Sequence, residues 1–213
     1  MFIFKLKKSV LVTYLGLIFG IISMLFIFTK VVFEEKAYLN YTLTFLILAG
    51  ICDMFDGKIA RKCKRTEEEK QFGIQIDSLA DTVNFVVLPV MLMMSLGMTS
   101  AVDVLIYIIY IICGVSRLAV FNLNASADEP VREYTGLPVT SAAIIYPFLG
   151  LIHKFLSDRI FNNISITVTL LVAVLFVLKI KIPKFKKTAY IIMPLLGIAG
   201  IVLLLVLKRC IMI

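Results

Sequence analysis

Long apolar runs recur along the whole chain, each of about the length that a helix needs to cross a bilayer. Hydrophobic residues fill 61% of the 213 positions, whereas soluble domains have roughly 45–50%. The sequence therefore predicts an all-α, polytopic membrane protein, with residues 1–213 as a single membrane-embedded domain. The predicted helices span residues 10–28, 38–62, 72–96, 102–123, 137–156, 164–178 and 188–207.

Lysine and arginine are unevenly distributed, which predicts the orientation of these helices. The chain has a net charge of +8, and its basic residues gather in segments 1–8, 62–70 and 179–187. If the helices alternate in direction, these segments share one side, which the positive-inside rule makes cytoplasmic. Each cluster could be a topology signal alone. Lys208 and Arg209 fall on the opposite side, so the last helix need not span fully.

The positive charge also bears on the partners of the chain. Nucleic acid is not expected, because the sequence offers no soluble basic domain or aromatic-basic platform to hold it. An anionic membrane surface or an anionic lipid substrate agrees better with basic clusters beside membrane helices. Membrane lipids are therefore expected partners.

Four carboxylates lie at helical spacings in the second and third predicted helices. Asp53 and Asp56 are three residues apart, and Asp77 and Asp81 are four apart, so each pair projects from one helix face. At 1.5 Å per residue, both pairs lie at similar depth below the cytosolic ends of an antiparallel hairpin. Clustered carboxylates need cations to offset their repulsion, and their oxygens suit Mg²⁺, Mn²⁺ or Ca²⁺. Four such groups suffice for two ions.

The four carboxylates have two alternative roles besides metal binding. They could pair with nearby basic side chains, of which Lys58, Arg61 and Arg117 are the candidates. They could also form the ion site of a cation- or proton-coupled transporter, because intramembrane carboxylates mark such pathways. A transporter predicts a polar path that continues to the far side, and the last three predicted helices offer no acidic residue within their cores.

The whole motif resembles the signature of the CDP-alcohol phosphotransferases. Every fixed position is filled, by Asp53, Asp56, Gly57, Ala60, Arg61, Gly73, Asp77 and Asp81. The spacer of eleven residues between Arg61 and Gly73 is longer than the eight usual in the family, and the extra residues are polar. The insertion therefore concerns a cytosolic loop and leaves the helical spacings intact.

Within this family, the chain most resembles the integral-membrane phosphatidylserine synthases. D-S-L-A-D-T-V-N-F-V-V-L-P, S-R-L-A-V-F-N at 116–122 and T-G-L-P-V at 135–139 are similar to sequences of that subgroup. The chain departs from the subgroup at Asn84, Val86 and Val120.

The resemblance implies a fold, a location and a reaction. The fold would have six core transmembrane helices, the seventh being an addition, in a homodimer of the cell membrane whose active site opens to the cytoplasm. The reaction would transfer a phosphatidyl group from CDP-diacylglycerol to L-serine and release CMP. The same chemistry with glycerol 3-phosphate or inositol phosphate as acceptor is an alternative, and it should need more cationic residues near the site.

The resemblance also implies roles for single residues. Asp53, Asp56 and Asp77 would be metal ligands for Mg²⁺ or Mn²⁺, two ions per site, and Asp81 would be a ligand, the general base, or both. The nucleotide pocket would be lined by Gly57, Ala60 and Gly73, although small residues also serve helix packing. Arg61 would bind the diphosphate, or merely mark the end of its helix.

Residues that bind the acceptor are harder to predict. Arg117 could pair with a phosphate or with the serine carboxylate, since guanidinium groups form bidentate contacts with both; it could equally extend to the membrane surface. Weaker candidates are Thr13, Asn84, Asn122 and Thr135.

Overall fold

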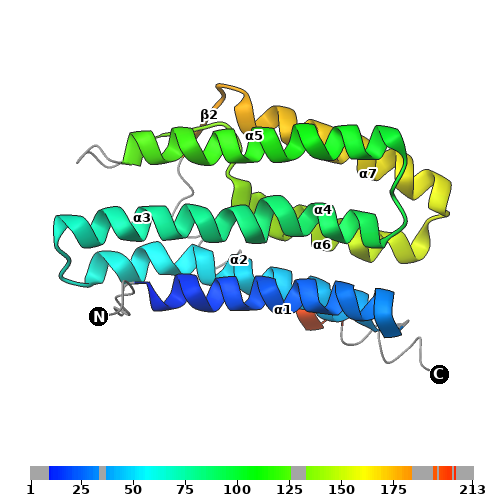
Figure 1. Cartoon of the computed structure of the whole chain (residues 1–213), viewed down its shortest axis with the longest axis horizontal. Helices are drawn as coiled ribbons and strands as arrows, with labels where there is room; N and C mark the ends of the chain where they lie inside the picture. Colours follow the sequence, from blue (N-terminus) through cyan, green and yellow to red (C-terminus); the bar gives the residue numbers. More distant parts are fainter. Residues whose placement is uncertain are drawn as a thin grey trace.

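The computed structural model describes residues 10–33, 37–125, 133–183, 194–195, 197–202 and 204. It is a helical bundle in which α3 and α4 form one continuous rod, with α1 and α2 on one side and α5 and α7 on the other (Figure 1). The helices are α1 Leu11–Phe33, α2 Tyr38–Lys62, α3 Glu67–Asp81, η1 Thr82–Val87, α4 Leu88–Ser95, α5 Ala101–Ala125, η2 Val139–Ser141, α6 Ala142–Ile152, η3 His153–Phe155 and α7 Asp158–Val177.

The helical architecture predicted from the sequence is confirmed, and its long apolar helices are consistent with a polytopic membrane protein. Within the described residues, four helices are long and apolar enough to cross a membrane: Leu11–Lys30, Glu67–Ser95, Ala101–Leu123 and Asp158–Val177. On α1, the large apolar side chains of Leu11, Leu15, Ile18 and Leu25 are exposed. Their spacing makes one outward face, as expected of a helix that contacts lipid. Of the predicted helix 188–207, the residues 194–195, 197–202 and 204 are helical, and the others lie outside the described part.

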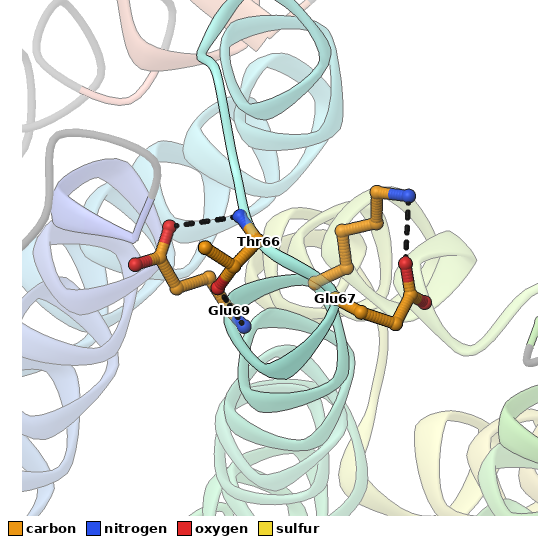
Figure 2. A network of polar contacts seen from close by, with 4 residues as sticks. Thr66, Glu67 and Glu69 are labelled. Atoms are coloured by element: carbon orange, nitrogen blue, oxygen red, sulfur yellow. Dashed lines mark hydrogen bonds and ion pairs between the residues drawn. The ribbon is translucent and has the colours of Figure 1, made fainter.

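The third helix begins at Glu67 rather than at residue 72. The reason is a capping box formed by two residues at its start. The Thr66 hydroxyl accepts from the Glu69 amide, and the Glu69 carboxylate accepts from the Thr66 amide (Figure 2). The box satisfies two of the amides left unpaired at a helix start, and acidic residues in the first turn complement the helix dipole. The loop after α2 is therefore confined to residues 63–66.

The rod that carries Asp77 and Asp81 changes its hydrogen-bond pattern directly after Asp81. Thr82–Val87 form a π-helix, and Pro89 follows at the start of α4. Proline has no amide hydrogen, so it cannot bond to the carbonyl four residues earlier, which belongs to Phe85. The Tyr110 hydroxyl of α5 donates to that carbonyl at 2.8 Å instead. The pairing fixes α5 against the rod just below the carboxylates.

Two further helices differ from their predicted bounds. Only Ala142–Ile152 is α-helical within the predicted helix 137–156, and it is flanked by 3-10 turns. Pro138 is extended at the start of this segment and restricts the preceding residue to extended conformations. Conversely, α7 begins at Asp158, six residues before the predicted start at 164, with an extended Ser157 preceding it. The acidic residue in its first turn favours this start.

A short two-stranded ladder, which the all-α prediction did not include, joins two distant loops. Strand β1, Glu133–Thr135, pairs antiparallel with β2, Lys181–Pro183. Beyond the ladder, the Gly136 amide donates to the Ile180 carbonyl at 2.8 Å, and the Leu137 amide donates to the Leu175 carbonyl at 2.9 Å. The segment before α6 is thereby attached to the end of α7.

Candidate active site

The hairpin of α2 and α3 brings the predicted carboxylates together. Asp53 and Asp56 project from α2 and Asp77 from α3, and one oxygen atom from each lies within 4.8 Å of the others. The carboxyl group of Asp81 contacts that of Asp53, and the carboxyl group of Asp77 contacts that of Asp56. Asp56 and Asp81 are only 7% and 8% exposed. The predicted convergence of the two pairs is confirmed.

The donor set fits a hard divalent cation. The Asp77 Oδ1 atom is buried and has no hydrogen-bond partner among the described residues, and burying an acceptor without a partner is costly. Ionised carboxylates in mutual contact also repel one another, and a cation between them or a shared proton relieves this repulsion. Oxygen-only sites of this kind suit Mg²⁺, Mn²⁺ or Ca²⁺. The residues that would hold such an ion are Asp53, Asp56 and Asp77, with Asp81 beside them.

A cavity of about 510 Å³ opens beside the four carboxylates, which is the size of a small-molecule site. Its polar end is lined by the carboxylates together with Gly57, Lys58, Arg61, Arg117, Thr140 and Ser141. Its other walls are apolar, with Ile47 and Ile51 from α2 and Ile144, Phe148 and Leu151 from α6. The cavity thus suits an amphiphile with an anionic head and an apolar tail.

The predicted nucleotide residues differ in their surroundings. Gly57 and Arg61 line the cavity, whereas Ala60 and Gly73 are not among the residues that line it. A Cβ atom added to Gly57 would have only the Arg61 Nη1 atom nearby, at 3.7 Å, and one added to Gly73 would have only Arg65 Nη1, at 3.7 Å, among the described residues. Neither glycine is therefore needed for close helix packing, which removes that alternative for both.

The predicted acceptor residues separate into two groups. Arg117 lines the cavity and is 7% exposed. Asn122 instead accepts a hydrogen bond from the Ser78 hydroxyl at 2.6 Å and ties α5 to α3, and Asn84 is buried in η1 and packs against Gly20 of α1. Neither asparagine lines the cavity. Thr135 lies in β1, and its side chain is outside the described part.

Thr13 also lies away from the cavity lining, but it contacts the carboxylate cluster. Its hydroxyl donates to Asp56 Oδ2 at 2.9 Å, and both side chains are buried. Sequence reasoning missed Lys58, Thr140 and Ser141 as residues of the cavity wall. Thr140 and Ser141 directly follow the T-G-L-P-V segment. Their position next to this motif is the sequence feature from which a place in the cavity wall could have been predicted.

Comparison with known proteins agrees with this arrangement. A family model described as CDP-alcohol phosphatidyltransferase matches residues 9–207. A Helicobacter pylori protein named CDP-diacylglycerol–serine O-phosphatidyltransferase is 28% identical over 174 residues, which cover 79% of this chain and 71% of the relative. A Bacillus subtilis protein of the same name is 34% identical over 148 residues, covering 68% and 76%. A Saccharomyces cerevisiae protein of that name is 34% identical over 128 residues, covering 56% of this chain and only 44% of the yeast protein.

Proposed function

The chain belongs to the CDP-alcohol phosphatidyltransferase family, and from this premise we propose that it transfers a phosphatidyl group from CDP-diacylglycerol to L-serine, forming phosphatidylserine and CMP. One observation carries the proposal: the carboxylate cluster lies at the polar end of a cavity whose remaining walls are apolar. A CDP-activated lipid has the same division between an anionic head and apolar chains. The names of the relatives from Helicobacter pylori and Bacillus subtilis support serine as the acceptor.

In this proposal the carboxylates would hold two divalent cations, Mg²⁺ or Mn²⁺, which would neutralise charge on the diphosphate. Asp81 accepts the proton of the serine hydroxyl as the new oxygen–phosphorus bond forms, and CMP leaves with the electrons of the broken bond. Gly57, with Ala60 and Gly73 nearby on the two helices, leaves room for the nucleotide. Arg61 and Lys58 bind the diphosphate from the end of α2.

The same proposal includes the domain organisation, the oligomeric state and the membrane orientation of the enzyme. Residues 1–213 form one domain with six core transmembrane helices and an added C-terminal helix, in a homodimer of the cell membrane. The polar end of the cavity faces the cytoplasm. The basic residues at the end of α2, Arg61 and Lys62, and in the following loop support this orientation.

The proposal is tested by measuring CMP release from CDP-diacylglycerol by the purified protein in detergent. We expect release that requires both L-serine and Mg²⁺ or Mn²⁺ and that stops on chelation. Parallel reactions contain glycerol 3-phosphate, inositol phosphate or no acceptor. Release with only one of these alcohols would move the acceptor assignment but keep the family chemistry. No release with any acceptor, from folded protein, would contradict the proposal and turn attention to a cation-coupled transporter.

Replacing Arg117 by methionine should weaken the binding of serine. The buried Arg117 guanidinium in the wall of the same cavity can pair with the serine carboxylate, and hydrogen bonds to charged groups contribute about 1.5–3 kcal/mol. We therefore expect the KM for serine to rise about 10- to 100-fold, with the KM for CDP-diacylglycerol nearly unchanged. Arg159→Met, an exposed arginine in the first turn of α7, is the matched control. A rise in the KM for the lipid donor alone would instead assign Arg117 to a phosphate.

A further inference from the structure

The Thr13 side chain forms a hydrogen bond with the carboxylate cluster and does not line the cavity. Its Oγ1 atom donates to Asp56 Oδ2 at 2.9 Å, from α1 to α2. A threonine hydroxyl has one hydrogen to donate, and in this contact it is directed to Asp56. Thr13 is also absent from the residues that line the cavity. A direct role in binding the acceptor is therefore not what the structure supports.

We propose that Thr13 is a positioning residue, which holds the Asp56 carboxylate in the orientation that binds a divalent cation; this rests on the proposed function of the cluster. A carboxylate can rotate about its Cβ–Cγ bond, and each orientation presents its oxygens differently. The hydrogen bond takes one lone pair of Oδ2, and the Gly57 amide also donates to this carboxylate, so the remaining lone pairs are the ones open to a cation. Partners of this kind fix the geometry of ligands, and their loss typically weakens metal affinity about 10- to 100-fold.

Close packing of α1 on α2 is what allows so short a side chain to reach Asp56. Gly16 lies one turn after Thr13 on the same face of α1, and a Cβ atom added there would lie 3.1 Å from Cys52 Cβ. Cys52 is in turn one helical turn before Asp56. The glycine contact and the hydrogen bond are consecutive contacts between two antiparallel helices. The β-branched threonine further restricts the rotamers available to the donor.

The burial of Thr13 and Asp56 makes the loss of their hydrogen bond costly. Thr13 and Asp56 are each 7% exposed, so water has little access to replace the threonine hydroxyl. A buried carboxylate oxygen that loses its donor is left unsatisfied. Besides Thr13, the Asp56 carboxylate contacts the Asp77 carboxyl group and the Gly57 amide, and the Arg61 charge lies near it. Thr13 is the donor among these contacts that comes from another helix.

The test measures Mn²⁺ binding to the purified full chain in detergent, without substrates, by calorimetry and by the electron paramagnetic resonance signal of free Mn²⁺. Thr13→Val keeps the shape of the side chain but removes the donor, and its dissociation constant for Mn²⁺ should be about 10- to 100-fold higher than that of the wild type. Thr13→Ser restores the donor and should restore the affinity. If the valine variant does not fold, Thr13→Cys provides a weaker donor and should give an intermediate loss.

Ser23→Ala is the matched control. Ser23 is fully buried on the same helix, and its hydroxyl donates to the Thr42 carbonyl of α2 at 2.8 Å. Removing it deletes a buried hydrogen bond between α1 and α2 at a distance from the cluster, so Mn²⁺ affinity should not change. In turnover, Thr13→Val should need more Mn²⁺ for half-maximal CMP release, with an unchanged KM for serine at saturating Mn²⁺.

Three results would overturn the inference: equal Mn²⁺ affinity of Thr13→Val and the wild type, equal losses in Thr13→Val and Ser23→Ala, or no Mn²⁺ binding by the wild type. In the first case, a raised KM for serine in Thr13→Val would make Thr13 an acceptor residue. Failure of serine as acceptor would contradict the proposed function alone, because the binding measurement contains no substrate.

Discussion

Asp77→Asn should lower the rate of CMP release by about 10²–10³-fold, the loss typical when one group that stabilises transition-state charge is removed. Asp77 contributes an oxygen within 4.8 Å of those from Asp53 and Asp56, and its buried Oδ1 lacks a hydrogen-bond partner among the described residues. An amide keeps the size of the side chain but is a poorer ligand for a hard cation. The measurement is initial CMP release at saturating serine over a range of Mn²⁺ concentrations.

Although Asp77→Asn should lose activity, its thermal stability without metal should not fall. Without metal, the carboxylates of the cluster repel one another, so neutralising one of them should leave the unfolding temperature equal or higher. With saturating Mn²⁺, the wild type should gain more stability than the variant, because the cation binds its folded state more tightly. An inactive variant that is also strongly destabilised without metal would contradict a metal-ligand role.

Asp103→Asn is the control for the asparagine substitution. Asp103 is 1% exposed, and its Oδ2 atom accepts from the Ser100 amide at 2.8 Å at the start of α5. It is thus another buried helical aspartate, but it lies outside the cluster. Its variant should keep CMP release near the wild-type rate. Equal losses in both variants would mean that any buried aspartate is needed for folding.

Gly136→Ala should reduce the free energy of unfolding by about 2–5 kcal/mol. Gly136 has a φ of +82°, and an added Cβ atom would lie 2.8 Å from the Phe176 carbonyl oxygen and 3.0 Å from that of Leu178. Alanine would therefore carry the left-handed backbone cost of roughly 1–2 kcal/mol and the cost of forcing these carbonyls apart. The measurement is unfolding in detergent, followed by circular dichroism.

Gly97→Ala separates these two costs. Gly97 has a φ of +93°, but an added Cβ atom would meet nothing within 4 Å among the described residues. Its variant should lose only the backbone contribution, about 1–2 kcal/mol. Equal losses at the two positions would contradict the close packing of Gly136 against the end of α7. Because Gly136 leads into the Pro138–Ser141 wall of the cavity, its variant should also lose activity that Gly97→Ala retains.

The carboxylate cluster was predictable from the sequence because it depends on local geometry. Spacings of three and four residues and a helical hairpin are enough to bring the two pairs together, and the predicted bounds of α2 match the observed Tyr38–Lys62. The predicted start of α3 lies five residues too late, because Thr66 and Glu69 lie in a polar segment without the apolar periodicity of a membrane helix. The π-helix after Asp81 was not predicted, and the Phe85 carbonyl within it accepts a hydrogen bond from Tyr110, which lies on another helix.

The acceptor residues could not be predicted to the same extent, because their positions depend on the rotation of α5. Arg117 and Asn122 are five residues apart, which places them about 140° apart around a helix. They cannot both face the cavity, and no local pattern in the sequence distinguishes between them. The structure has Arg117 on the cavity wall and Asn122 against Ser78. The difference follows from the packing of α5 on α3 and η1, which involves residues far apart in the chain.

The short connection between α2 and α3 affects the order in which parts of the protein fold during synthesis. All four carboxylates belong to one hairpin closed by residues 63–66, and short loops cost little entropy to close. The cluster can therefore assemble while the ribosome is still synthesising α5 to α7, since contacts between near neighbours in sequence form early. Later helices then add the cavity wall around a preassembled charged centre. If the cluster binds a divalent cation as proposed, the hairpin alone carries all of its ligands, so the cation can bind before the substrate cavity is complete.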